Sequence, residues 1–223
     1  MADIIDDTEL VNIGIKGFVN FDDYNLDSPD NDLSANGNFA SFNESYRSST
    51  SILSKNWGDA FSGDFIHRFK FLVNTPPSVT QGTVIIWAVC AEPATYSYIS
   101  HGPDCVKWTG DEKKAIMLSY NYNDGESEHR LSLHNYGVNT VEFNNINISS
   151  WVYIELKRTA QWVTLTGFYD EFITPAFTGQ VQMYSSYNYP YHEIAGRGQR
   201  ECETGYTNPD AYVSMQIGDL IFL

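Results

Sequence analysis

The stretch Trp151-Val-Tyr-Ile-Glu-Leu-Lys-Arg158, followed after two residues by Gln161-Trp-Val-Thr-Leu-Thr-Gly-Phe168, decides the fold class. Apolar and polar residues alternate in both runs, which is typical of a β-strand with one face in a core. The two runs predict a hairpin with a polar outer face, and therefore a sheet that is wet on one side. The residues predicted to point inward are Val152, Ile154, Leu156, Val163 and Leu165, with Tyr153 and Glu155 outward.

Strand patterns continue on both sides of this hairpin. Residues 83–90 are apolar on both faces, as expected of a strand inside a sandwich, and no long window carries the i, i+3, i+4 stripe of a helix. Short strands separated by Gly, Asn and Pro indicate an all-β protein, an antiparallel β-sandwich of jelly-roll type. The other predicted strands are 65–73, 115–120, 130–134, 138–143 and 212–223.

Size and charge limit the possible partners. The 223 residues are enough for one domain with a sizeable core, and an aromatic content of 15% excludes general disorder. The chain carries 28 acidic and 13 basic residues, a net charge of −15. Nucleic acids and anionic membranes are therefore not expected partners, because both are bound through basic residues. No apolar run approaches the length of a membrane span.

The acidic excess is concentrated at the N-terminus. Residues 1–32 hold nine acids and one base, a charge of −8, which leaves 19 acids and 12 bases for the rest. We therefore divide the chain into an acidic arm, residues 1–32, and a jelly-roll domain, residues 33–223. Such a charge run is either a solvated segment or an arm that docks on a basic protein surface. The docking residues would be Asp3, Asp6, Asp7 and Glu9.

Cysteine and metal signals are sparse. The three cysteines, Cys90, Cys105 and Cys202, have no C-x-x-C spacing, so reduced, buried thiols are expected, although Cys90 and Cys105 could pair if oxidised. No zinc spacing occurs among the histidines. We expect no cofactor and no metal. Calcium would need loop carboxylates, and no spacing singles out any of the available ones, Asp22, Asp23, Asp27, Asp30 and Asp124.

Three motifs resemble one family. The stretch Lys55-Asn-Trp-Gly-Asp-Ala-Phe-Ser-Gly-Asp-Phe-Ile-His-Arg-Phe69 is similar to a strand-entry motif of concanavalin A-like, LamG-type jelly rolls, found in phage virion and environmental bacterial proteins. The hairpin of residues 151–168 resembles a late hairpin of the same domains. Residues 183–188 with 216–221 resemble their last two strands. The resemblance covers residues 33–223 and implies the jelly-roll fold; residues 1–32 have no counterpart in it.

No catalytic signature is present. The Glu-x-Asp-x-x-Glu strand of sandwich glycosidases is missing, and so are the nucleophile elbow, His-Glu-x-x-His and the phosphate loop. Glu201-Cys-Glu203 is the nearest carboxylate pair, in a polar loop. His67 shares a face with Phe65 and Phe69, which favours a hydrogen-bonded core histidine. The protein is therefore predicted not to be an enzyme.

Tyrosines suggest a binding surface. Glycan sites stack sugars on aromatic rings and bind hydroxyl groups with polar side chains, although tyrosine is also common in protein interfaces. A second candidate patch holds Tyr96, Tyr98 and His101. The main glycan candidates are Tyr184, Tyr187, Asn188, Tyr189, Tyr191 and His192.

An acidic jelly roll without catalytic motifs, similar to domains of phage proteins, fits a structural component of a virion. We therefore predict a capsid decoration, cement or fibre-associated protein, made in the host cytoplasm and located on the capsid surface or fibre. Its partners would be the major capsid or other virion proteins, with a homo-oligomer in the assembly. The alternative is a lectin-like module, free or virion-borne, that binds a host-surface glycan; a glycoside hydrolase or lyase is a third hypothesis.

Overall fold

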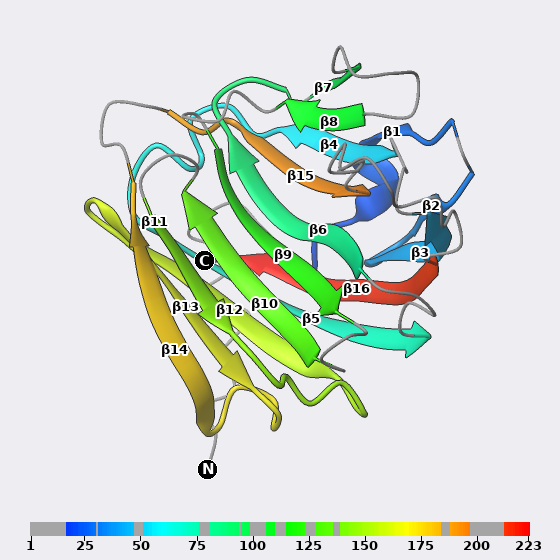
Figure 1. Ribbon diagram of the computed structural model, residues 1–223. Helices are drawn as coiled ribbons and strands as arrows, with labels where there is room; N and C mark the ends of the chain where they lie inside the picture. The colour runs from blue at the N-terminus through cyan, green and yellow to red at the C-terminus, as the bar shows by residue number, and fades with distance from the viewer. Residues whose placement is uncertain are drawn as a thin grey trace.

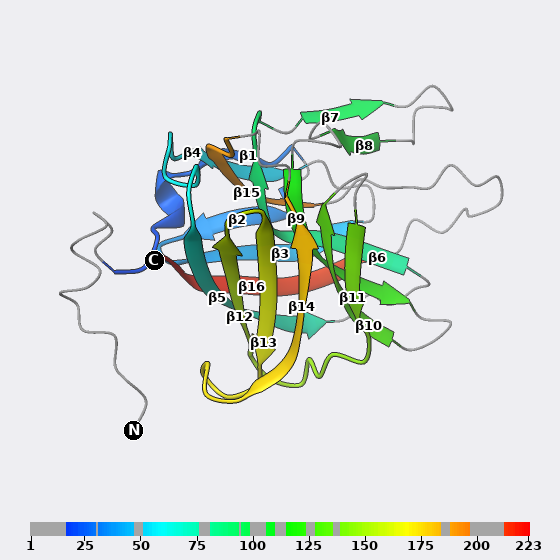
Figure 2. The same ribbon diagram turned by 90° about the vertical axis from the view of Figure 1, so that its left-hand side faces the viewer.

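Two antiparallel sheets stack face to face in the computed structural model of the chain (Figure 1). The structure describes residues 17–29, 31–46, 51–75, 81–93, 95–98, 106–109, 115–123, 128–135, 139–183, 188–196 and 212–223. Each sheet has seven strands within this part of the chain, and Figure 2 shows the same two layers after a quarter turn. The predicted all-β sandwich of jelly-roll type is confirmed. No described helix is long and apolar enough to cross a membrane.

Sheet A contains the strands that will carry the candidate site. Its order is β1 (Asn25–Asp27), β4 (Ile52–Asn56), β15 (Tyr191–Gly196), β6 (Gln81–Cys90), β9 (Ala115–Asn123), β10 (Glu128–Asn135) and β11 (Asn139–Phe143). Sheet B has the order β14 (Pro175–Gln182), β13 (Trp162–Phe168), β12 (Val152–Thr159), β5 (Phe65–Thr75), β16 (Tyr212–Phe222), β3 (Phe39–Tyr46) and β2 (Leu33–Asn36). A separate hairpin pairs β7 (Thr95–Tyr98) with β8 (Val106–Thr109).

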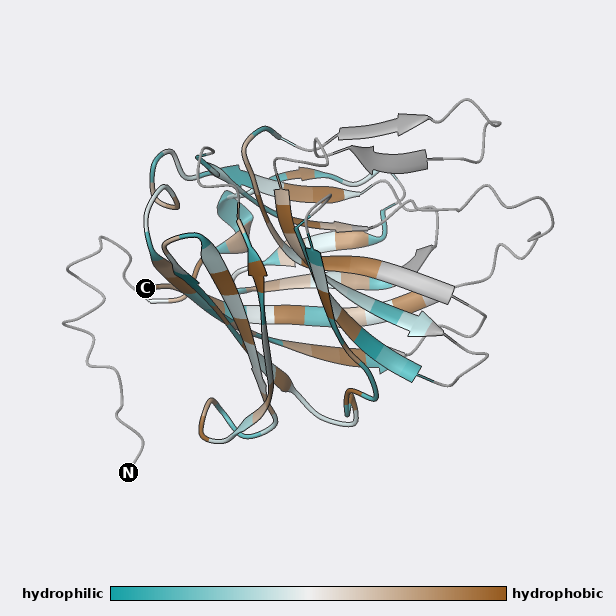
Figure 3. Cartoon of the chain, turned by 60° about the vertical axis from the view of Figure 1, so that its left-hand side comes forward, coloured by the Kyte–Doolittle hydropathy of each residue, from teal (hydrophilic) through white to brown (hydrophobic). Residues whose placement is uncertain are grey.

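The hydrophobic core lies between the two sheets. Figure 3 shows apolar residues spread along the strands of both layers. The hairpin of β12 and β13 has the predicted orientation, because all five residues predicted to point inward have no exposed surface. Tyr153 and Glu155 are only partly buried on the outer face, where Glu155 pairs with Arg68 at 2.7 Å. The predicted face assignment of this hairpin is therefore confirmed.

Part of the predicted acidic arm belongs to the sandwich. Residues 21–23 form a short 3-10 helix, η1 (Phe21–Asp23), and Phe21 is fully buried in the core. Strand β1 pairs with β4 in sheet A. Val19, Phe21 and Tyr24 of this segment are buried in the same core cluster as the strands that follow residue 32. The proposed docking residues Asp3, Asp6, Asp7 and Glu9 lie outside the described residues.

We expect the substitution Ile154→Ala to lower the free energy of unfolding by about 2–5 kcal/mol. Ile154 has no exposed surface and lies in the centre of the sandwich, so its removal leaves a cavity. Lys157→Ala, at an exposed position on the same strand, serves as control and should change stability by less than about 0.5 kcal/mol. Urea unfolding measures both; similar values for the two variants would contradict the core assignment.

Candidate functional site

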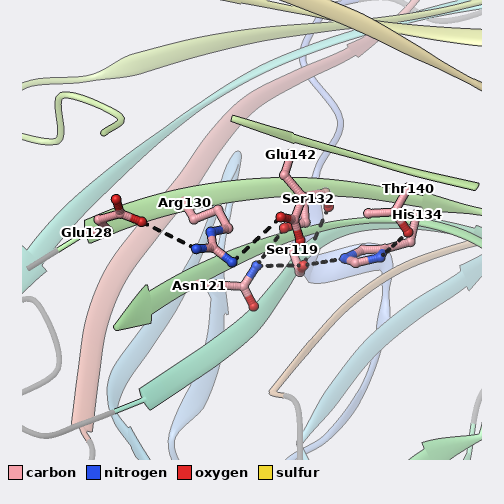
Figure 4. Close-up of polar contacts among 8 residues, drawn as sticks. All are labelled: Ser119, Asn121, Glu128, Arg130, Ser132, His134, Thr140 and Glu142. Carbon is pink, nitrogen blue, oxygen red and sulfur yellow. Dashed lines mark hydrogen bonds and ion pairs between the residues drawn. The ribbon is translucent and has the colours of Figure 1, made fainter. Parts of the chain in front are cut away.

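A set of polar side chains lies together on the outer face of sheet A. Successive residues of a strand point to opposite faces, so the strands that send Leu118, Leu131 and Leu133 into the core send their neighbours outward. Figure 4 shows these outward residues. We call them the polar strip: Ser119 and Asn121 from β9, Glu128, Arg130, Ser132 and His134 from β10, and Thr140 and Glu142 from β11.

Strand register brings the members of the polar strip into contact. Asn121 lies opposite Arg130, and His134 lies opposite Thr140. Ser132 has Ser119 on one side and Glu142 on the other. Side chains paired in this way are direct neighbours on the sheet surface. The strip is therefore a product of three adjacent strands and not of one sequence motif.

The uncharged half of the strip is a connected hydrogen-bond network. Asn121 Nδ2 donates to Ser119 Oγ and to Ser132 Oγ, both at 3.1 Å. Ser119 Oγ lies 3.2 Å from His134 Nε2, and His134 Nδ1 lies 3.1 Å from Thr140 Oγ1. Both serines are buried, Asn121 and His134 are half-buried, and Thr140 is exposed. The buried serines thus hold in place the polar groups that face the solvent.

The charged half of the strip is centred on Arg130. Its Nη2 lies 3.3 Å from Glu128 Oε2, and its Nη1 lies 3.6 Å from Glu142 Oε2. The side chain of Glu142 is 47% exposed and that of Arg130 is 30% exposed. Solvent therefore reaches both ion pairs, so their contribution to stability is small.

The polar strip can bind a ligand rich in hydroxyl groups. It offers amide, hydroxyl, guanidinium and carboxylate groups on neighbouring strands, and a few fixed polar groups of this kind orient a ligand in a binding site. Strands hold such groups more precisely than loops. Among the described residues there is no group of three His, Cys, Asp or Glu side chains that could hold a metal ion.

A second, apolar cluster lies on the outward side of the same sheet. Cys90 and Met117 are buried there, together with Ile52, Ile85, Ala88, Ala115 and Ala195. Glu193 is also fully buried, and the Cys90 thiol donates to its Oε2 at 3.6 Å. Burial, and then the Glu193 carboxylate, raise the pKa of the Cys90 thiol well above its usual value. The prediction of a buried, reduced thiol is confirmed for Cys90; Cys105 and Cys202 lie outside the described residues.

Among the described residues, those predicted around β15 to bind a glycan do not all face the solvent. Tyr191 points outward and is half-buried against the apolar cluster. His192 and Tyr189 have no exposed surface, so these two rings cannot stack on a ligand, and their prediction as glycan contacts is corrected. For His192 the physical reason is the two-residue period of a strand, which turns it inward next to Tyr191.

The remaining predicted glycan residues are dispersed or lie outside the description. Asn188 is exposed and donates from Nδ2 to Asp59 Oδ1 at 2.8 Å. Tyr184 and Tyr187 are not among the described residues. In the second patch, the side chains of Tyr96 and Tyr98, and His101 as a whole, also lie outside them.

Sequence reasoning missed the polar strip, although it predicted its strands. Polar residues alternate with apolar ones in Arg130-Leu-Ser-Leu-His134, which indicates one polar face. Only the pairing of β9 with β10 and of β10 with β11 shows that three such faces adjoin. A search for hydrogen-bonding residues at alternate positions of neighbouring strands would have found it.

Solved structures with the same architecture include a lectin, a lectin-like domain and an alginate lyase. A legume lectin-like domain from Entamoeba histolytica has a TM-score of 0.56 at 10% identity, covering 90% of this chain and 89% of that one. The PL7 alginate lyase AlyA1 from Zobellia galactanivorans has a TM-score of 0.52 at 16% identity, covering 88% and 82%. The lectin UEA-II, complexed with galactose, has a TM-score of 0.52 at 12% identity, covering 92% and 94%.

The likeness shows a concanavalin A-like jelly-roll fold. At these identities it shows the fold alone. No protein-family model and no curated protein matches the chain. The LamG-type subgroup and the phage context stay predictions.

Two buried histidines form a polar centre in the core. The Trp87 indole donates from Nε1 to His67 Nδ1 at 3.0 Å, and Tyr24 Oη lies 2.9 Å from His192 Nδ1. An indole can only donate, so the proton of a neutral His67 sits on Nε2. Burial lowers the pKa of His192 to about 3, and burial together with the nearby His192 ring lowers that of His67 well below 6.5. The prediction of His67 as a hydrogen-bonded core histidine is confirmed.

We expect the free energy of unfolding to fall as the pH drops from about 6.5 towards 5. In the unfolded chain both histidines take up protons near the ordinary histidine pKa of about 6.5. In the folded protein they stay neutral, so acid favours the unfolded chain. Each contributes a slope of up to about 1.4 kcal/mol per pH unit. Urea unfolding across this window measures the slope, and His192→Gln should remove one histidine's share. An unfolding free energy that stays constant between pH 6.5 and 5 would contradict the neutral core pair.

Proposed function

We propose that the protein is a carbohydrate-binding module that holds a glycan on the polar strip of sheet A. The observation that carries this proposal is the network in which buried Ser119 and Ser132 position Asn121 and His134 at the surface. Sugars present dense donors and acceptors, and a preorganised row of complementary groups binds them with little loss of side-chain entropy.

The similar structures support the same class of ligand. Two of them are named as a lectin or a lectin-like domain, one in complex with galactose, and the third is named as an alginate lyase. These names describe the ligands and activities of those proteins. The proposal for this chain rests on its own polar strip, and the names agree with it.

We propose binding without cleavage. Both ring nitrogens of His134 are within hydrogen-bond distance of hydroxyl oxygens, of Ser119 and Thr140. A neutral imidazole has one donor and one acceptor, so this arrangement uses both. Arg130 is paired with two carboxylates. Proton transfer by His134 would require breaking the network, which favours a binding role.

The structural virion role stays a prediction. Its proposed docking residues lie outside the described part of the chain. The virion partners and the location on the particle stay predictions as well. A glycan-binding module carried on a virion would satisfy both hypotheses, with the polar strip facing a host-surface glycan.

A matched pair of threonine variants tests the site. Thr140→Val removes the hydroxyl that contacts His134, whereas Thr166→Val removes a hydroxyl on the outer face of sheet B, where Thr166 contacts Thr178. Thr140→Val should weaken glycan binding about five-fold, the value of one hydrogen bond. Thr166→Val should bind like the wild type. Glycan-array screening followed by titration calorimetry measures both; equal losses, or no binding at millimolar ligand, would reject the site.

Incubation with polysaccharides tests the absence of catalysis. The purified protein should release neither reducing ends nor unsaturated sugars, even from a polysaccharide that retains it. Release that disappears in an Asn121→Ala or His134→Ala variant would show that the polar strip is an active site.

A further inference from the structure

We infer that Glu128 and Glu142 determine the specificity of the polar strip by excluding anionic glycans, so that its ligand is a neutral glycan. This inference rests on the proposed function. It follows from the charges on the strip, from how Arg130 is held, and from the charge of the whole chain.

The fixed charges of the strip sum to −1. Arg130 is its one cation and Glu128 and Glu142 are its two anions; with histidine counted as neutral, the other five members carry no charge. A ligand on this surface therefore meets hydrogen-bonding groups and a slight excess of negative charge.

Arg130 is held between the two carboxylates. Glu128 contacts Nη2 and Glu142 contacts Nη1, so the two terminal nitrogens of the guanidinium face different carboxylates. A uronate carboxylate would bind arginine best through the same forked N–H groups. It would have to enter between two groups of its own charge, and like charges brought together in an interface oppose binding. A neutral sugar meets no such repulsion.

The net charge of the whole chain also opposes the binding of anionic glycans. The net charge of −15 repels a polyanion before contact, most strongly at low ionic strength. Specificity often depends on such a repulsive element as well as on attractive contacts. Glu128 and Glu142 are that element at short range.

The test compares neutral and anionic polysaccharides with two double variants of equal charge. Glu128→Gln with Glu142→Gln removes the two negative charges that contact Arg130. Glu155→Gln with Glu171→Gln makes the same charge change on the other side of the sandwich and releases Arg68, which pairs with Glu155 at 2.7 Å. Affinity electrophoresis at pH 8 and low salt uses galactomannan, β-glucan, alginate and polygalacturonate as probes.

We expect the wild type to be retarded by a neutral polysaccharide and not by alginate or polygalacturonate. The Glu128/Glu142 variant should gain binding to the uronates of at least about ten-fold, because the two negative charges that face Arg130 and repel a carboxylate are then gone. That gain should shrink at about 0.3 M salt, where charges are strongly screened. The Glu155/Glu171 variant should gain none.

Three results would overturn the inference. Two of them would leave the proposed glycan site intact, and the third would reject it too. Wild-type binding to uronates as tight as to neutral glycans would reject the charge filter and keep the glycan site. So would a Glu128/Glu142 variant that binds neutral glycans but gains no uronate binding. If neither the wild type nor the Glu128/Glu142 variant is retarded by any of the four polysaccharides, the proposed function falls and the inference falls with it.

Discussion

The contact between Trp87 and His67 sets how the two sheets face each other. Trp87 lies on β6 of sheet A and His67 on β5 of sheet B, and their 3.0 Å hydrogen bond crosses the fully buried core. A bulge in β6 makes this possible, because it turns Ile86 and Trp87 both inward while Ile85 and Ala88 face outward. A packing that separated the two rings would leave the buried indole N–H without its acceptor, which costs free energy.

The geometry of the polar strip depends on the packing of this core. Leu118, Leu131 and Leu133 anchor β9 and β10 from the inside, and the residues between them point outward at strand spacing. Site and core therefore share the same backbone. A change that shifted either strand would move Asn121 and His134 relative to each other, so the packing of the core sets the geometry of the polar strip.

The two outer faces of the sandwich use charge differently. On sheet B, Arg68 pairs with Glu155, and Lys70 pairs with Asp219 while lying 4.7 Å from the centre of the Trp151 ring. Each of these two cations is matched by one anion. On sheet A, Arg130 has two carboxylate partners, and the neutral network lies beside it. The proposal of a neutral glycan ligand rests on this second arrangement.

The sequence by itself determined the fold class and much of the core. The two-residue period in 151–168 was sufficient to place Ile154 inward and Tyr153 outward. The apolar residues that share a strand face with His67 were sufficient to predict its burial, because alternation within one strand is a local property. The tertiary structure decided which outward faces adjoin and which aromatic residues remain accessible. Tyr189 and His192 are buried by packing against distant strands, and the polar strip exists only through the register of β9, β10 and β11. Neither property can be read from one strand, since the first depends on the pairing of neighbouring strands and the second on packing between the sheets.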